Sequence, residues 1–231
     1  MIIGFLSDAH CGVIPDDNPA RDAGLYTLLV TMLARCDKVV IVGDLLEMYT
    51  RRGGRKRHFE KIEYNYRLTT GLIRRNGARI LCVEGNHDDG YLKMLSGSAA
   101  KYHLVDGYLF MHGHRSDPFF AHRTMEKITE KIIRAVFRVE GWLGGVTRFR
   151  LSAWVANHQH RNAAGRDRLR RMALRMLESQ PLLRGIVAGH THIYDYFALP
   201  GGQVYFNAGA YLWGDAWVLD TKTRQFDRLG W

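Results

Sequence analysis

The chain opens with Met1-Ile2-Ile3-Gly4-Phe5-Leu6-Ser7-Asp8-Ala9-His10, an apolar run that ends directly in side chains able to bind a metal ion. Four later segments repeat this arrangement. Their polar blocks are Gly43-Asp44, Gly85-Asn86-His87-Asp88, His112-Gly113-His114 and Gly189-His190-Thr191-His192. Short apolar runs of this kind are typical of buried strands. Since α/β folds place their sites at the carboxyl ends of such strands, we expect the five blocks to converge on one rim of a sheet.

Between the apolar runs, helical patterns predict an α/β fold. Helices are expected over about residues 22–35 and 59–75, as crossovers between parallel strands. Antiparallel strands are expected at 194–199, 203–207, 216–220 and 225–229. His112 and His190 are farther apart than a simple crossover requires, and the sequence between them is mostly helical in pattern. We therefore predict a four-layer α/β/β/α sandwich formed by one domain, 1–231, with a helical insertion at about residues 116–183.

Composition limits the functional classes. The formal net charge of +10 favours an anionic partner such as a nucleotide, a nucleic acid or an anionic membrane face. The three scattered cysteines, Cys11, Cys36 and Cys82, indicate neither a disulfide framework nor a zinc knuckle. We see no secretory signal and no apolar stretch near the ~18–20 residues of a membrane span. A cytoplasmic protein is expected, with peripheral contact on the inner face of the membrane as an alternative.

The five blocks together resemble the motif pattern of the calcineurin-like metallophosphoesterase family. In order along the chain, they read D-x-H, G-D, G-N-H-D, H-G and G-H-x-H. The five blocks run from Asp8 to His192, most of the chain. The resemblance implies two divalent metal ions. Asp44 would bridge them, Asp8, His10 and His192 would complete one shell, and Asn86, His112 and His190 would complete the other. Mixed imidazole and carboxylate ligands suit Mn²⁺, Fe or Zn²⁺ better than Ca²⁺, and we favour Mn²⁺.

The resemblance also implies a mechanism. A hydroxide that bridges the metals would attack phosphorus in line, and His87 would protonate the leaving oxygen or stabilise the developing charge. Asp88 is expected to hold the other ring nitrogen of His87 and so determine its tautomer. Cys11 is adjacent to ligand His10, and an inert buried thiol is favoured over a thiolate ligand.

Further residues are candidates for binding the substrate. His114 would contact a substrate oxygen or the second metal, and Asn207 matches a late block of the family and is expected to support the site. Arg51 and Arg52 begin a basic loop with Arg55, Lys56 and Arg57. A second basic cluster lies in the insertion, interleaved with apolar residues, and suggests a substrate with an anionic head and apolar tails. Its members are Arg161, Arg166, Arg168, Arg170, Arg171 and Arg175.

The long insertion and the Gly43-Asp44-Leu45-Leu46-Glu47 block are similar to the UDP-2,3-diacylglucosamine hydrolases of lipid A biosynthesis. That similarity implies cleavage of the pyrophosphate of a UDP-linked lipid. His87 and His114 depart from the commonest pattern of that group, so other functions stay open. A phosphodiesterase or nuclease would explain the basic charge. A metal-bound scaffold without activity is the other alternative, against which the complete ligand set and His87 argue.

Overall fold

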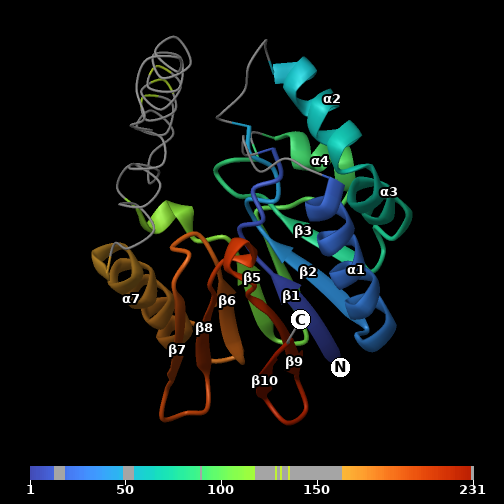
Figure 1. The fold of residues 1–231 in the computed structure, drawn as a ribbon. Helices are drawn as coiled ribbons and strands as arrows, with labels where there is room; N and C mark the ends of the chain where they lie inside the picture. Colours follow the sequence, from blue (N-terminus) through green and yellow to red (C-terminus); the bar gives the residue numbers. More distant parts are fainter. Residues whose placement is uncertain are drawn as a thin grey trace.

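The computed structural model describes residues 1–12, 19–48, 55–88, 90–117 and 163–229, together with residues 128, 131 and 135. Within these ranges the chain forms two five-stranded sheets with helices on their outer faces (Figure 1). Among the described residues, no helix is long and apolar enough to cross a membrane.

The first sheet has the order β10-β9-β1-β2-β3. Its strands are β1 (Ile2–Leu6), β2 (Lys38–Val42), β3 (Ile80–Val83), β9 (Ala216–Asp220) and β10 (Gln225–Arg228). β1, β2 and β3 are parallel, with Phe5 opposite Val40, while β9 is antiparallel to β1. The predicted parallel strands and the last two antiparallel strands are therefore confirmed.

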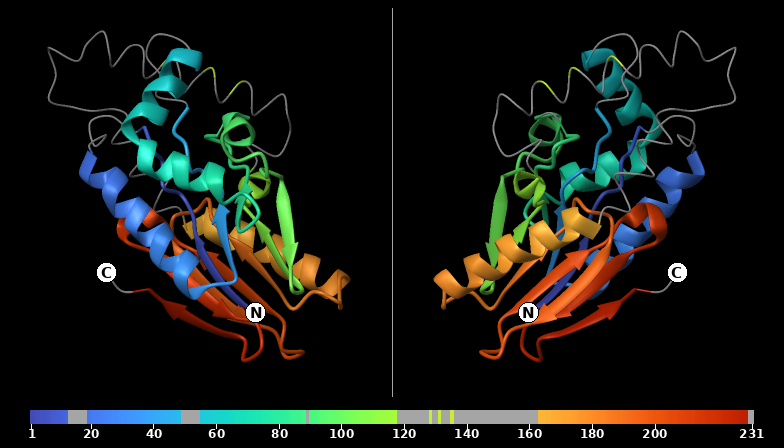
Figure 2. Two further views of the ribbon diagram at one scale, coloured as in Figure 1. Left: turned by 90° about the vertical axis from the view of Figure 1, so that its right-hand side faces the viewer. Right: turned by 90° about the vertical axis from the view of Figure 1, so that its left-hand side faces the viewer.

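The second sheet has the order β4-β5-β6-β8-β7. Its strands are β4 (Tyr102–Val105), β5 (Tyr108–Met111), β6 (Gly185–Ala188), β7 (Tyr194–Ala198) and β8 (Val204–Ala208). β4 was not predicted from the sequence; it forms a hairpin with β5 through Asp106 and Gly107. Both turn residues have positive φ, 47° and 81°, as a tight hairpin turn requires. Figure 2 shows the turns of the β7–β8 and β9–β10 hairpins at the same end of the molecule.

The helices are α1 (Pro19–Arg35), α2 (Arg55–Asn65), α3 (Arg67–Arg75), α4 (Tyr91–Ser96) and α7 (Ala163–Ser179), with the short 3₁₀ helices η1 (His114–Ser116) and η2 (Tyr211–Trp213). The prediction of one helix over 59–75 was wrong, because the chain breaks at Tyr66 into α2 and α3. The Asp22 carboxylate accepts the backbone N–H groups of Leu68 and Thr69 at 3.1 and 3.0 Å. This side chain of α1 thus satisfies donors that a new helix leaves unpaired in its first turn.

Three apolar clusters hold four layers together, which confirms the predicted α/β/β/α sandwich. Alternate residues of β2 divide between two of them: Val39 and Ile41 face α1 and α3, whereas Val40 and Val42 face the other sheet. The third cluster packs Leu169 and other residues of α7 on the outer face of the second sheet. In Figure 1, α1 and α7 lie on opposite sides of the two sheets.

The structure describes only part of the predicted insertion. Of residues 116–183, the structure describes the end of η1, α7 and the turn that follows, and residues 128, 131 and 135. α7 confirms the mostly helical pattern for its part of the insertion. Apart from residues 128, 131 and 135, residues 118–162 of the insertion lie outside the described residues.

Candidate metal centre

All the predicted metal ligands lie in loops that follow the carboxyl ends of β1, β2, β3, β5 and β6. These strands belong to both sheets, so the ligands meet where two sheets end side by side, not on the rim of a single sheet. Among the described residues, seven other than glycine have positive φ. Five of them are ligand candidates: Asp8, His10, Asp44, His190 and His192. Such backbone strain is concentrated at functional sites.

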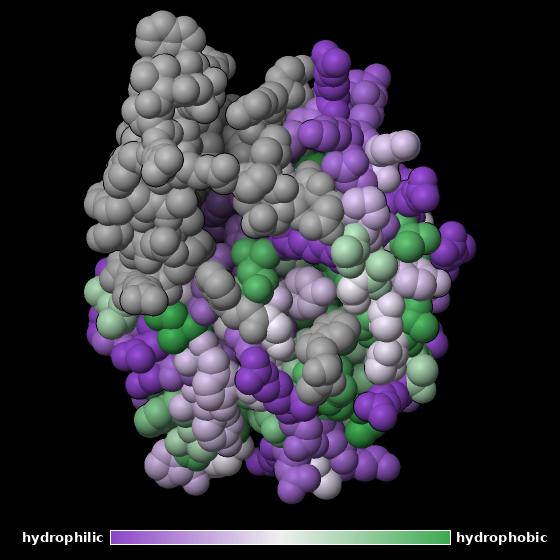
Figure 3. Space-filling model, in the orientation of Figure 1, coloured by the Kyte–Doolittle hydropathy of each residue, from purple (hydrophilic) through white to green (hydrophobic). Residues whose placement is uncertain are grey.

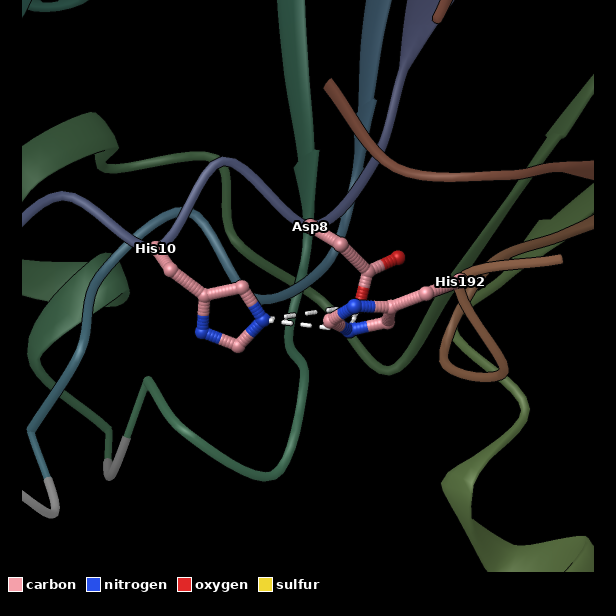
Figure 4. Close-up of side chains that lie close together, drawn as sticks. All are labelled: Asp8, His10 and His192. Carbon is pink, nitrogen blue, oxygen red and sulfur yellow. Dashed lines mark hydrogen bonds and ion pairs between the residues drawn. The ribbon is translucent and has the colours of Figure 1, made fainter. Parts of the chain in front are cut away.

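The first group of ligands consists of Asp8, His10 and His192, which come from the loops after β1 and β6 (Figure 4). The Nε2 atoms of His10 and His192 are 3.2 Å apart, and His192 Nε2 is 2.9 Å from Asp8 Oδ1. His10 Nδ1 donates to Glu47 Oε2 at 3.2 Å, so Nε2 of the neutral ring carries a lone pair. Facing lone pairs and a carboxylate need a cation or shared protons between them.

The second group consists of Asp44, His112 and His190. His112 Nδ1 donates to the Val42 carbonyl at 2.9 Å, so Nε2 of the neutral ring is an acceptor. This Nε2 is 3.0 Å from Asp44 Oδ2 and 3.2 Å from Asn86 Oδ1, so three acceptor atoms face one another. A hydrogen bond that orients the far nitrogen of a histidine is the usual support of a metal ligand. The donor set therefore fits a divalent cation.

Asp44 lies between the two groups. Its Oδ2 atom is 3.0 Å from His112 Nε2 in one group and 4.0 Å from His10 Nε2 in the other. Asp44 therefore faces imidazoles of both groups, and its bridging of two metals stays a prediction. The loop after β3 can approach Asp44 closely because Gly85 in that loop has no side chain: a Cβ atom there would lie 2.0 Å from Asp44 Oδ1.

The charges of the centre compensate one another. Burial favours neutral Asp44, but the nearby His112, His87 and His10 outweigh it and hold the pKa of the carboxyl below its usual range. For His112, burial is likewise outweighed, by Asp44 and Asp8, and the pKa of the imidazole rises to about 9. The buried Asp44 carboxylate therefore strongly favours a nearby positive charge, which a bound metal ion would supply.

Glu47, not Asp88, is the partner of His87. His87 Nδ1 donates to Glu47 Oε2 at 2.7 Å, whereas the Asp88 carboxylate accepts backbone N–H groups of three residues. These are Asp44, Leu46 and Gly85, at 3.0, 2.9 and 2.7 Å. The expected Asp88–His87 hydrogen bond was therefore wrong. Asp88 instead joins the loop after β2 to the loop after β3, because its buried oxygens find their donors on the backbone.

Glu47 was not predicted as a site residue. Its carboxylate accepts hydrogen bonds from both His10 and His87, and His58 Nε2 donates to its backbone carbonyl at 2.9 Å. Burial would raise the pKa of Glu47, but His87 and His10 outweigh it and lower the pKa. The available sequence signal was an acid three residues after ligand Asp44, among apolar residues, and the structure buries it.

The remaining candidates have different positions. The His114 ring lies 5.6 Å from the His112 ring and 6.3 Å from the His190 ring, beside the second group, and burial followed by the charge of His112 lowers its pKa to about 3. Asn207 is fully buried and donates to Gly189 O and Thr191 Oγ1 at 2.9 and 3.0 Å. It supports the His190 loop, and this geometry offers no support for a substrate contact. Cys11 is buried, as expected.

Arg51 and Arg52 lie outside the described residues. The neighbouring helix α2 presents a hydrophilic surface on the face shown in Figure 3. Its Lys56 is exposed and pairs with Glu60 one turn later, at 3.9 Å.

Buried histidine and aspartate side chains thus form a candidate metal centre at the ends of strands from two facing sheets. The calcineurin-like phosphoesterase family model matches residues 1–194, and the chain belongs to this family. No curated protein sequence matches the chain.

Two solved structures illustrate the similarity. A dimetal phosphatase from Danio rerio is 13% identical, with 98% of this chain and 91% of that chain covered and a TM-score of 0.53. A metallophosphoesterase from Sphaerobacter thermophilus is 15% identical, with 100% and 88% covered and a TM-score of 0.47. The first of these supports the fold.

Proposed function

We propose that the chain hydrolyses phosphoester bonds with two divalent ions held on either side of Asp44. The observation that carries the proposal is the position of this carboxylate, whose Oδ2 atom faces imidazoles of both ligand groups. When bound, the two ions would polarise the phosphoryl oxygens and lower the pKa of a water between them. We favour Mn²⁺, with Fe and Zn²⁺ as alternatives for the same ligands.

His87 is proposed to supply the proton for the leaving oxygen. Its Nε2 atom is 4.0 Å from Asp44 Oδ2, and its Nδ1 atom is engaged by Glu47, so Nε2 faces the centre. Burial lowers the pKa of this imidazole, but Glu47 and Asp44 outweigh burial and raise it. A raised pKa favours the protonated ring that a general acid requires.

We expect Glu47→Gln to lower metal affinity or kcat about 10- to 100-fold, the usual cost of losing a group that orients a ligand. The substitution keeps the size of the side chain and removes the charge that His10 and His87 share. Mn²⁺ titration and kcat on a phosphodiester with an alkyl leaving group measure the two effects. Glu60→Gln is the matched control, since Glu60 is exposed on α2. Unchanged metal affinity together with unchanged kcat would show that Glu47 does not position these rings.

For the substrate, we propose a UDP-linked lipid of the 2,3-diacylglucosamine type. The support is the Gly43–Glu47 block and the long segment between His112 and His190, of which α7 is the largest described part. Nucleotides or nucleic acid are the second candidate, favoured by the net charge of +10. Because such a lipid has an anionic head and apolar tails, a cytoplasmic protein that cleaves it would benefit from peripheral contact with a membrane.

A substrate panel separates these candidates. The Mn²⁺-loaded protein would be tested on bis-p-nitrophenyl phosphate, UDP-diacylglucosamine, a cyclic nucleotide and single-stranded DNA, with the Asp44→Asn protein as the control for contaminating enzymes. We expect UMP release from the UDP-lipid to exceed turnover of the others. DNA cleavage whose binding weakens steeply with salt would instead support the nuclease. A protein that binds metal and cleaves nothing in the panel would contradict catalysis and support the scaffold alternative.

A further inference from the structure

A groove of about 530 Å³ lies between η1 and α7. Figure 1 shows these two elements next to each other, and they are in contact. The walls of the groove carry four arginines and two methionines: Arg115, Arg168, Arg171, Arg175, Met172 and Met176. Those on α7 recur every three or four residues and therefore lie on one face of the helix. The buried Leu169, Ala173 and Leu177 occupy the adjacent face, which packs on the second sheet.

The arginines of α7 divide into two sets. Arg166 and Arg170, away from the groove, pair with Asp167 and Asp195. In the groove, Arg168 is 3.9 Å from Asp117. Among the residues that the structure describes, no carboxylate pairs with the other three groove arginines, Arg115, Arg171 and Arg175. The groove therefore gathers positive charge that the described part of the protein leaves largely uncompensated.

The groove begins beside the metal centre. Arg115 is three residues after ligand His112, a separation of at most about 11 Å along the chain. The helix also packs directly on the ligand loop, because a Cβ atom on Gly113 would lie 2.8 Å from Leu169 Cδ1. A ligand bound at His112 can therefore extend into the groove without leaving the protein surface.

Guanidinium groups bind phosphate with paired, charge-assisted hydrogen bonds, and methionine forms an adaptable apolar wall. We propose that the groove binds a second phosphate group of the substrate, a few bonds from the phosphoryl group that is cleaved, with the adjoining part of the substrate against Met172 and Met176. The proposal rests on the proposed function, because it takes the metal centre as the place of cleavage.

A matched pair of substrates isolates the second phosphate: thymidine 5′-(p-nitrophenyl phosphate), with and without an added 3′-phosphate. With Mn²⁺-loaded protein we expect kcat/KM to be about tenfold or more higher for the substrate with two phosphates, the scale of one charge-assisted hydrogen bond. In Arg171→Ala/Arg175→Ala the ratio should fall toward one. Alanine is a good helix former at these exposed positions, so α7 should be kept.

Lys101→Ala/Lys222→Ala is the control, since it removes the same charge from exposed positions outside the groove. This control variant should keep the wild-type ratio of kcat/KM between the substrate with two phosphates and the substrate with one. Equal kcat/KM on both substrates in the wild type would overturn the proposal, as would an advantage that survives the double arginine substitution. Binding to phosphatidylglycerol vesicles that requires both arginines, with a substrate ratio near one, would overturn it in favour of a membrane surface.

Failure of the proposed function can be recognised separately. If neither substrate is cleaved, calorimetry of thymidine 3′,5′-bisphosphate and thymidine 5′-monophosphate tests the groove alone. Tighter binding of the bisphosphate that is lost in the double arginine variant would support the groove and refute only the hydrolysis. Equal affinity for the two nucleotides would refute the groove.

Discussion

Asp44→Asn is expected to abolish tight metal binding and to reduce phosphodiester hydrolysis by at least about 10³-fold. Polarisation by bound cations contributes several kcal/mol to such reactions, and each 1.4 kcal/mol corresponds to a factor of ten in rate. In the wild type, Asp44 Oδ1 accepts the His87 backbone N–H at 2.8 Å. Asparagine keeps the shape of the side chain and an oxygen that can accept the same N–H group. It removes the negative charge that His10, His87 and His112 face.

Elemental analysis of the purified protein measures the metal directly. We expect the loss of both ions, because the Asp44 carboxylate faces imidazoles of both ligand groups. Asp227→Asn is the matched control, since Asp227 is exposed on strand β10. Retention of two metal equivalents in Asp44→Asn would refute the bridging role. Retention of one would assign the carboxylate to a single ion.

The ligand set could be predicted because each ligand directly follows a buried strand. Val39 to Val42 is apolar throughout and fully buried, so the residues immediately after it must leave the sheet at the site. Chain order thus places Asp44 and His112 at the same end of the molecule, although β2 and β5 belong to different sheets. The assignment of strands to two sheets depends on pairing between distant segments, which apolar periodicity does not encode.

The wrong predictions for the 59–75 helix and for the partner of His87 have one physical origin. In each case a side chain forms hydrogen bonds with a backbone or ring that is distant in sequence. Asp22 begins α3 by accepting N–H groups 46 and 47 residues later, so the apolar pattern of 59–75 contains no sign of the break. Asp88 is adjacent to His87 in sequence, yet its oxygens point to the loop after β2. Glu47 reaches His87 across 40 residues. Adjacency in sequence was therefore a poor guide to hydrogen-bond partners.

Strand β4 illustrates a different limit. Its residues Tyr102 and Leu104 are exposed at the edge of the second sheet, so burial provides only weak alternation. The turn at Asp106-Gly107 is a stronger signal, because both residues tolerate positive φ. Turn chemistry would have identified this hairpin where apolar periodicity did not.

His87→Gln should lower kcat by about 10²- to 10⁴-fold on substrates with a poor leaving group, the range attributed to a positioned general acid. The residue is only partly buried. It lies close enough to His10 and Asp44 to form a third possible ligand group with them, but neither group proposed for the two metals includes it. We therefore expect the variant to keep both ions by elemental analysis. This separates the effect from that of Asp44→Asn, in which metal and activity are lost together.

The leaving group distinguishes a proton donor from a group that only stabilises charge. p-Nitrophenolate leaves without protonation, so a general acid at His87 predicts a small effect of His87→Gln on bis-p-nitrophenyl phosphate and a large effect on an alkyl ester. A histidine that stabilises charge on the phosphoryl oxygens predicts similar losses on both. His103→Gln is the control, because His103 donates to the Cys82 carbonyl at 3.0 Å, away from the ligand loops. Equal losses would refute the acid role and leave His87 as an electrostatic contact to the substrate.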